Sequence, residues 1–395
     1  MYLNYGFHIF SKNLIANIIL IIQLTVSIIL MNITLGLYNE AYSKLDVLSG
    51  FNSDSVVYQN SSDKLLSEQN IEEYKKELNI TDNIKLEPIM NGFSSSDNGA
   101  VMFCAYGSNT SRSMRLTIKS GQWYEDCKKD TEYINTVVYG SSKYNVGETY
   151  TMKLCNFATE EQKAFKFKIT GIIDEKTGVI LGNTGSNSIS VKEMFETFNS
   201  ENYGADYLFL FNYEDNSDIK NYLTFSSSLF AYSNDNSAIS TQDINNMKKL
   251  GQTFTIREIS DNTKDGLQSE MHSVFPSAIS ITLIGVIGII CLIILNTIKC
   301  KKVFAVYFIC GMKWKDCLKI IICHILCIFI GTVFLVAVAF GVMASTNMFT
   351  ETHLLIKWNN LFITLGLFVM VLAVSIITAK CMLSNTSPVT DLRKE

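Results

Sequence analysis

The sequence predicts an α-helical membrane protein in which an α+β domain is inserted between the first and second of four transmembrane helices. Four long apolar stretches predict the helices, and they cover residues 14–37, 278–298, 320–344 and 361–379. None of them contains Asp, Glu, Lys or Arg, and a helix needs about 20 apolar residues to cross a hydrocarbon core of about 30 Å. Buried core helices are the alternative interpretation, but the length of all four stretches and their lack of charged residues favour transmembrane helices.

Acidic and basic residues are distributed unevenly between the middle of the chain and its two ends. Residues 40–270 contain 22 basic and 33 acidic residues, a net charge of −11, whereas the remainder has a net charge of +7. The middle of the chain is therefore predicted to be an acidic, water-exposed domain. It has no basic stripe of the kind that nucleic acid requires, so nucleic acid is not an expected partner.

The short loops predict the orientation, because basic residues gather on the cytoplasmic side. Lys12, Lys380 and the six lysines of residues 299–319 lie on one side of the predicted helices, whereas the loop 345–360 on the other side has only Lys357. Both termini are thus expected in the cytoplasm and the large domain outside. The predicted segments are a cytoplasmic N-terminus (1–13), TM1 (14–37), the extracellular domain (38–275), TM2 (276–298), a cytoplasmic loop (299–319), TM3 (320–344), an extracellular loop (345–360), TM4 (361–383) and a cytoplasmic tail (384–395).

The first apolar stretch also invites interpretation as a signal peptide. It is longer than the usual apolar region of such a peptide, only Lys12 precedes it as a basic residue, and no clear small-x-small cleavage site follows. We therefore expect a retained transmembrane helix.

Within the large domain, alternating patterns predict strands, and 3.6-residue patterns predict helices. A β-rich subdomain is expected over about 93–200, inserted into a mixed α+β framework. Strands are predicted at 100–106, 113–120, 133–140, 148–155, 164–175, 207–213 and 252–259, and helices at 64–80, 191–198, 241–250 and 265–273.

No catalytic or metal-binding pattern stands out. The sequence lacks GxxxxGK[ST], HExxH, GxSxG and paired CxxC motifs, so we expect no enzyme activity, no metal and no cofactor in this chain. Cys323, His324 and Cys327 have ligand-like residue types but lie within a predicted helix, where packing is the simpler interpretation. Of the external cysteines Cys104, Cys127 and Cys155, one pair has the option of a disulfide, and the sequence does not select it.

Polar residues in the first apolar stretch are expected to face other helices, since polar groups facing lipid are costly. They serve either helix packing or a substrate path. The residues are Asn17, Gln23, Thr25, Ser27 and Asn32.

The loop 299–319 combines six lysines with an apolar run at 303–312. As a helix this run is about 15 Å long, too short to cross a membrane, and it is apolar on every side. Either it extends the second transmembrane helix and packs on neighbouring helices, or a cytoplasmic partner covers it. Gly311 is suited to end a helix, and Trp314 is suited to the membrane interface.

Several local patterns then point to one family. After the second apolar stretch come two lysines, an apolar helix, a glycine and a basic turn, which resemble the corresponding region of FtsX/MacB-type permeases of ABC transporters. The tail 387–395 resembles the Pro-x-x-x-x-Leu-Arg ending of that family. Residues 118–126, 137–152 and 167–175 resemble segments of the MacB-like periplasmic core domain. The order of one span, a large domain and three more spans matches the family across essentially the whole chain.

This resemblance implies a permease chain that pairs with a second permease chain and with a separate ABC ATPase, which would bind ATP and Mg. The chain would transmit ATP-driven movement to its extracellular domain (mechanotransmission), in the plasma membrane of a bacterium and in contact with lipid. Where the family often has Glu and Arg, this chain has Val303 and Phe308, which predicts a more apolar contact with the ATPase. The implied ATPase-coupling residues are Lys301, Lys302, Phe304, Phe308, Gly311, Met312, Lys313, Trp314 and Lys315, with Pro388, Leu392 and Arg393 in the tail.

The sequence and its resemblance to the family are consistent with two classes of function. One is export or extraction of a peptide, an antibiotic or a lipid-linked substrate. The other is an FtsX-like or sensor/immunity protein, which regulates a cell-wall hydrolase or binds an antimicrobial peptide without transport. The large domain favours the first class, because the outer domains of FtsX-type proteins are much smaller.

Overall fold

The computed structural model describes residues 2–60, 66–67, 70–96, 99–140, 143–156, 159–180, 186–198, 204–345 and 358–384. The chain divides into two compact units. We call them the helical unit (Met1–Asn39 and Gln268–Glu395) and the sheet unit (Glu40–Leu267). Each is described by itself.

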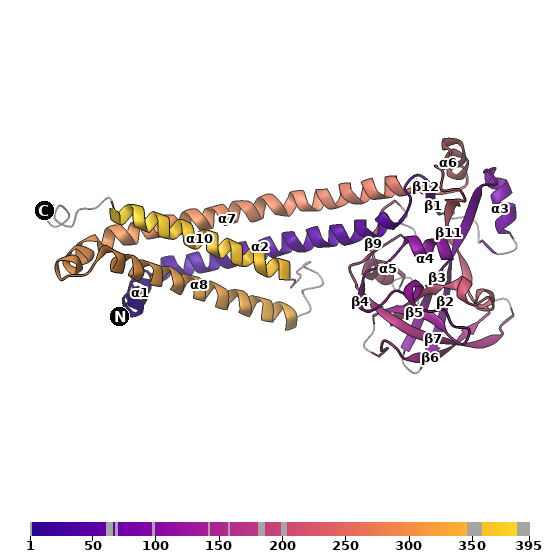
Figure 1. The fold of residues 1–395 in the computed structure, drawn as a ribbon, viewed down its shortest axis with the longest axis horizontal. Coiled ribbons are helices and arrows are strands. Elements are labelled where there is room, and N and C mark those ends of the chain that lie inside the picture. Colours follow the sequence, from indigo (N-terminus) through magenta and orange to yellow (C-terminus); the bar gives the residue numbers. More distant parts are fainter. Residues whose placement is uncertain are drawn as a thin grey trace. The chain divides into compact units, whose positions relative to one another are not determined.

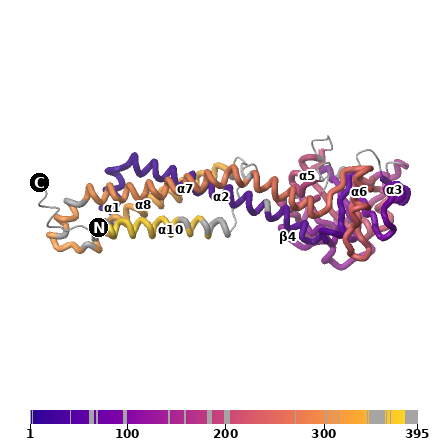
Figure 2. The backbone as a smooth tube through the Cα atoms, turned by 90° about the horizontal axis from the view of Figure 1, so that it is seen from above, coloured from indigo at the N-terminus to yellow at the C-terminus, as the bar shows by residue number. Residues whose placement is uncertain are grey.

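The helical unit is a bundle of long apolar helices, and Figures 1 and 2 show α2, α7 and α8 running side by side. Among the described residues, four helices are long and apolar enough to cross a membrane, as the sequence predicts, with candidate spans at Leu14–Gly50, Ile256–Cys300, Lys315–Met343 and Thr364–Cys381. The helices of this unit are α1 (Tyr2–Lys12), α2 (Leu14–Asp46), α7 (Ile256–Ile309), α8 (Trp314–Ser345) and α10 (Trp358–Ser384). The expected cytoplasmic loop 299–319 is thus mostly helical.

The sheet unit is built on one mixed ten-stranded sheet. Its strand order is β12-β1-β11-β2-β3-β10-β5-β7-β4, and β6 also pairs with β7, off this order. The pairs β10–β3 and β5–β7 are parallel, and the other pairs of this sheet are antiparallel. The strands are β1 (Val56–Asn60), β2 (Ile84–Ser96), β3 (Gly99–Tyr106), β4 (Ile118–Gly121), β5 (Ile134–Tyr139), β6 (Thr149–Cys155), β7 (Gln162–Ile173), β10 (Tyr207–Asn212), β11 (Thr224–Ser233) and β12 (Gln252–Thr255).

Short elements complete this unit. A separate two-stranded sheet joins β8 (Gly178–Val179) to β9 (Ile189–Ser190). The helices are α3 (Ile71–Leu78), α4 (Ser108–Ser113), α5 (Val191–Phe198) and α6 (Thr241–Lys248), and the short 3-10 helices include η1 (Val47–Gly50). Figure 1 shows α3 and α6 near β12 and β1, where Tyr74 and Met247 pack in one buried cluster.

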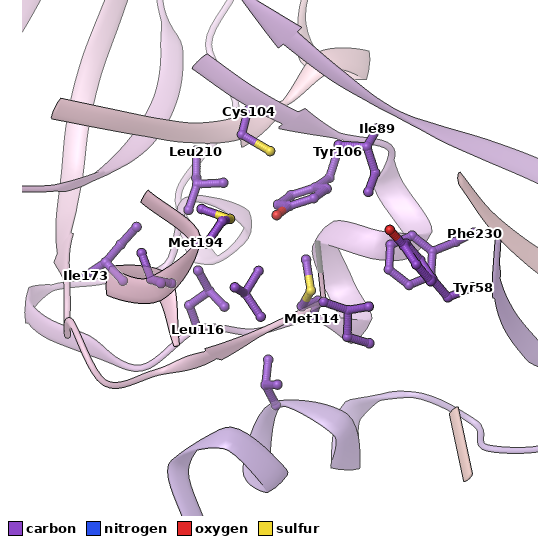
Figure 3. Packing of buried hydrophobic residues seen from close by; sticks show 14 of the residues in the cluster. Tyr58, Ile89, Cys104, Tyr106, Met114, Leu116, Ile173, Met194, Leu210 and Phe230 are labelled. Carbon is purple, nitrogen blue, oxygen red and sulfur yellow. The ribbon is translucent and has the colours of Figure 1, made fainter. Parts of the chain in front are cut away.

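The central strands are buried on both faces, which explains their continuous apolar sequence. Along β3, the side chains of Val101, Phe103 and Ala105 join one core cluster, whereas Met102, Cys104 and Tyr106 join the other. This is the period of two that a pleated strand imposes. Figure 3 shows the second cluster, in which Cys104 and Tyr106 lie among Met114, Met194 and Leu210.

Several predicted elements differ from the structure, two of them around the start of α7. The strand expected at 252–259 stops at Thr255, where α7 begins. The Thr255 hydroxyl accepts from the amide of Glu258 (3.1 Å), and the Glu258 carboxylate accepts from the amide of Thr255 (2.8 Å). This capping box starts a helix where the apolar pattern alone indicates a strand. The helix expected at 265–273 is part of α7, which runs on through Pro276.

The strand expected at 113–120 is reduced to β4, because α4 extends to Ser113 and residues 114–117 connect the two elements. The buried carboxylate of Glu87 accepts hydrogen bonds from the amides of Asn109 (3.1 Å) and Thr110 (2.7 Å) and so caps this helix from outside. The helix expected at 64–80 is described over α3 only, and residues 61–65 and 68–69 lie outside the described ones. The β-rich subdomain is expected over about 93–200. The strand β10 comes after this range in the chain, yet it lies between β3 and β5 in the sheet.

Candidate functional site: the turn between α7 and α8

The residues implied in ATPase coupling lie at the end of α7, in the turn after it and at the start of α8. The turn consists of residues 310–313 and contains Gly311, Met312 and Lys313. The side chains of Lys301, Lys302, Phe308 and Trp314 lie outside the described ones, and so do Pro388, Leu392 and Arg393 with their whole segment.

Gly311 ends α7 in a Schellman-type cap. Its φ is +92°, and the amide of Met312 donates to the carbonyl of Tyr307 (2.9 Å), five residues back. A Cβ placed on Gly311 would meet nothing within 4 Å, so the backbone conformation rather than space requires glycine here. The sequence thus encodes a sharp stop of the helix at this position.

Asp316 begins α8 on the other side of the turn. Its carboxylate accepts from the amide of Lys313 (3.4 Å), three residues back, and its own amide donates to the carbonyl of Lys313 (2.8 Å). An acidic group in the first turn of a helix also interacts favourably with the helix dipole. The turn is therefore held at both of its ends by local hydrogen bonds.

The apolar run before the turn has a buried side and an exposed side. Phe304 and Ala305 are buried, and Phe304 packs in one cluster with Cys317 and Ile320 of α8. On the exposed side lie Val303, Val306 and Ile309, which are 47%, 49% and 69% exposed. Spacings of three residues keep these side chains along one side of the helix. We call them the apolar stripe.

The structure agrees with the first interpretation of the run 303–312, whereas a covering partner stays a prediction. The run does extend α7 and pack on α8, but the apolar stripe stays uncovered within the described chain. The stripe begins three residues beyond Cys300, where the candidate span of α7 ends. Lys313 and Lys315 are exposed beside it. Phe304, which the family resemblance implies as a coupling residue, is buried, whereas the exposed Val306 and Ile309 carry no such signal in the sequence.

An N-terminal helix that the sequence analysis missed packs against this turn. The Tyr2 hydroxyl donates to Asp316 Oδ1 (2.9 Å), and this bond raises the pKa of Tyr2 above its ordinary value. The ring of Tyr5 meets the ring of Tyr307 edge-on with 5.6 Å between centroids. Figure 1 shows α1 at the same end of the helical unit as the turn between α7 and α8. Half-buried Tyr2, Ile9 and Phe10, at helical spacing, are the signal that would have found α1.

Hydrogen bonds of polar side chains link the helices near the turn between α7 and α8. The side-chain amide of Asn13 donates to Asn296 Oδ1 (2.7 Å), and that of Asn17 donates to the Phe10 carbonyl (2.7 Å). His324 Nε2 lies 3.2 Å from Asn17 Oδ1. Ser27 makes a similar bond to Thr282 (2.6 Å), so Asn17 and Ser27 of the first span take part in helix packing, as expected.

No group of three or more metal-ligating side chains comes together in the described part of the chain. Cys104, Cys127 and Cys155 form no disulfide with one another, so the external pairing that the sequence allows is not realised here. Cys104 is buried, and Cys127 and Cys155 are half-buried.

The motifs at 118–126 and 137–152, which resemble the MacB-like core domain, form turns and packing contacts in the sheet unit. Gly121 has a φ of +84°, and a Cβ on it would lie 2.3 Å from the carbonyl oxygen of Thr170. Trp123 follows closely, and its indole N–H donates to the Ser111 carbonyl (3.0 Å) in the buried core. Gly140 and Gly147 also have positive φ values, +87° and +93°. These motifs fix turns and packing in the sheet unit.

The chain is similar to two solved structures of external transporter domains. The periplasmic region of MacB from Actinobacillus actinomycetemcomitans is 12% identical, with a TM-score of 0.30 over 56% of this chain and 95% of that one. The extracellular domain of the noncanonic ABC-type transporter YknZ from Gram-positive bacteria is 10% identical, with a TM-score of 0.24 over 53% of this chain and 93% of that one. Both scores lie below 0.5, so neither likeness establishes a shared fold. No family model and no curated protein matches the chain.

Proposed function

We propose that this chain is the permease subunit of an ABC transporter of the MacB/FtsX type. In this proposal a separate ATPase subunit docks on the turn between α7 and α8, and its ATP-driven movement passes through the helices to the sheet unit. The observation that carries the proposal is the apolar stripe of Val303, Val306 and Ile309, which lies beyond the end of a candidate span with exposed lysines beside it.

Such a surface has the composition of a protein interface. Apolar side chains at the centre and charged ones at the rim are typical of contacts between subunits, and a patch of this kind on a soluble surface marks a binding site. The departure from the family pattern at Val303 and Phe308 agrees with an apolar contact at this place. The order of spans and the local sequence motifs support the ATPase as the occupant.

The chemistry would then be shared between chains. The sequence contains no nucleotide-binding motif, so ATP and Mg would be bound by the partner ATPase. The four apolar stretches contain no Asp, Glu, Lys or Arg, which favours transmission of movement over a polar solute path. A second permease chain, a bacterial plasma membrane with both termini in the cytoplasm, and a peptide, antibiotic or lipid-linked substrate at the sheet unit complete the proposal.

The test is affinity purification of the tagged full-length chain from its native cell in mild detergent, with an ATPase assay on the eluate. The double variant Val306→Ser/Ile309→Ser removes most of the apolar stripe without touching the buried side of α7. The matched control is Val146→Ser in the sheet unit, since Val146 is also an exposed valine (40%). We expect a stoichiometric ATPase with the wild type and the control, and at least a tenfold lower yield with the double variant.

A second variant examines the lysines at the rim. Charge reversal in Lys313→Glu/Lys315→Glu is expected to weaken ATPase binding, because rim charges steer association. Equal ATPase recovery from all variants would remove the turn as the docking site. An eluate without any ATPase would contradict the transporter and favour the alternative of an FtsX-like or sensor/immunity protein.

A further inference from the structure

One short segment of the sheet unit contacts the ends of both long helices that reach into this unit. It consists of residues 177–180 and 186–193, which contain β8, β9 and the start of α5. The strands β8 and β9 pair antiparallel, with Gly178 opposite Ser190 and Val179 opposite Ile189, apart from the large sheet. We call these residues the bracket.

On the side of α2, the bracket is bound by an ion pair. Lys44 Nζ lies 3.0 Å from Glu193 Oε1 and 3.2 Å from Glu40 Oε1, and Lys44 and Glu40 are both buried. The other oxygen of Glu193 accepts from the amide of Ser190 (2.7 Å), so the carboxylate joins α2 to β9. A buried ammonium group needs such partners, because removing one leaves an uncompensated charge.

The backbone also approaches α2 closely at one point. A Cβ on Gly178 would lie 2.6 Å from the Cα and 2.6 Å from the carbonyl oxygen of Lys44. Only glycine permits this approach, so the sequence keeps β8 in contact with the helix backbone.

On the side of α7, hydrogen bonds hold the bracket. The amide of Ser188 donates to Thr263 Oγ1 (2.9 Å) in a buried position, and the side-chain amide of Asn262 donates to the carbonyl of Ser186 (3.1 Å). The Thr263 hydroxyl donates in turn to the carbonyl of Ile259 (2.6 Å), one turn back in α7. Thr263 thus links the bracket amide to the helix backbone.

An apolar cluster fills the space between these polar contacts. It joins residues that directly follow α2, residues of the bracket and residues of α7 within one buried core, namely Val47, Leu48, Val179, Ile180, Val191, Ile256 and Ile259. The bracket is therefore in contact with both helix ends through polar bonds and through packing.

We propose that Lys44 is a positioning residue which, together with Thr263, makes the bracket and the ends of α2 and α7 within the sheet unit move as one body. This inference rests on the proposed function in one respect, since ATP-driven movement would enter the sheet unit through these helix ends. Without that movement, the same contacts would only stabilise the sheet unit.

The test is amide hydrogen exchange on the full-length chain in lipid nanodiscs, which reports local opening of cooperative units. Lys44→Met keeps the aliphatic length of the side chain but removes its charge. We expect exchange at 186–193 to become at least tenfold faster in this variant and to stay within about threefold of the wild type in Lys44→Arg, while β3 and β10 remain unchanged.

A second variant keeps the test decisive if Lys44→Met fails to fold. Thr263→Val removes the acceptor of the Ser188 amide without changing any charge, and we expect faster exchange in the same amides. Its matched control is Thr332→Val, because Thr332 is also a buried threonine that bonds to the carbonyl four residues back. Unchanged exchange at 186–193 in the variants of both contacts would overturn the inference.

Adding ATP and Mg to the complex with the copurified ATPase separates this inference from the proposed function. We expect nucleotide to alter exchange at 186–193 in the wild type, and this response to be lost in Lys44→Met although the ATPase stays bound. A full response in the loosened variant would overturn the positioning role of Lys44. No response in the wild type would count against the proposed function, and nucleotide-free exchange would then decide whether the bracket holds the helix ends together.

Discussion

The hydroxyl of Tyr2 lies 2.9 Å from Oδ1 of Asp316 and joins the first turn of α1 to the first turn of α8. Lys319 takes part in the same contact, since its ammonium group lies 2.9 Å from the same carboxylate oxygen and 5.0 Å from the centre of the Tyr2 ring. Asp316 also caps α8 at the turn. The N-terminal helix and the turn between α7 and α8 are thus parts of one structure, and a change in α1 should be felt at the turn.

The close approach of α1 to α8 depends on Gly6. A Cβ on this residue would lie 2.7 Å from the Cβ of Cys323 and 3.0 Å from the amide nitrogen of His324. We expect Gly6→Ala to push α1 away from α8 at a cost of about 1–3 kcal/mol, the usual range for overpacking. Hydrogen exchange of the α1 amides in nanodiscs should then become roughly tenfold faster or more.

The control for this substitution is Gly341→Ala, also in a helix, where an added Cβ would meet nothing within 4 Å. It should leave exchange in α1 unchanged and stabilise its own helix slightly, since alanine is the better helix former. If Gly6→Ala left α1 as protected as the control does, the close packing of α1 on α8 would be wrong.

Gly311 gives a different kind of prediction, because its conformation and not its surroundings require glycine. With φ at +92° and open space around it, Gly311→Ala should destabilise the turn by about 1–2 kcal/mol. Gly311→Asn should cost less, since asparagine adopts positive φ values more readily. The readout is the exchange rate of the Met312 amide, whose hydrogen bond to Tyr307 closes the cap. Equal rates in the alanine and asparagine variants would contradict this explanation.

The central strands β3, β5 and β10 were predictable because they are short apolar runs bounded by turn residues, whereas β1, β2 and β11 were missed. Pro88 and Gly92 within β2 are residues that usually interrupt strands. In the structure Pro88 pairs with Leu229 next to a register shift in β11, so an irregularity in the partner strand accommodates it. Such compensation between strands distant in sequence is not visible in either strand alone.

The place of the candidate site was predictable, but its exposed side was not. A run that is apolar on every side carries no periodic signal that distinguishes one face from another. The exposed face is determined by α8, because its Cys317 and Ile320 cover Phe304, whereas Val306 and Ile309 stay exposed. Which face of the run stays exposed depends on this tertiary contact. The sequence therefore predicts the segment as a whole but not its exposed face.

Trp123 carries a prediction about the stability of the sheet unit. It is 4% exposed, and its indole N–H donates to the carbonyl of Ser111. Trp123→Phe would leave this buried carbonyl without that bond and open a small cavity, so we expect a loss of about 2–4 kcal/mol. Proteolysis of the full-length chain across a urea series should show an earlier midpoint for cleavage within the sheet unit.

The comparison for Trp123→Phe is Val146→Ala, a surface change expected to stay within about 0.5 kcal/mol. A midpoint for Trp123→Phe that coincides with that of Val146→Ala would mean that the Trp123 contact adds nothing to stability.

Buried ionisable groups in the core predict alkaline sensitivity of the sheet unit. Burial raises the pKa of Cys104 from an ordinary value of 9.0 to about 12, and it also raises that of Tyr58 to about 12. Between these values the unfolded chain releases a proton that the folded chain retains. The unfolded state then binds fewer protons, so the free energy of unfolding falls as pH rises from about 9 towards 12. For Cys104 alone the loss at pH about 10.5 is of the order of 2 kcal/mol.

The measurement is the urea midpoint for proteolysis of the sheet unit at pH values of about 7.5, 9 and 10.5. Cys104→Ala removes the thiol that titrates, so its stability should fall less steeply over this interval although it is lower at neutral pH. The remaining slope should come from Tyr58 and other buried tyrosines, because their hydroxyl groups stay protonated in the fold for the same reason. Parallel pH curves for the wild type and Cys104→Ala would show that the thiol is not kept neutral by the core, since a group with the same pKa in both states adds no pH dependence to stability.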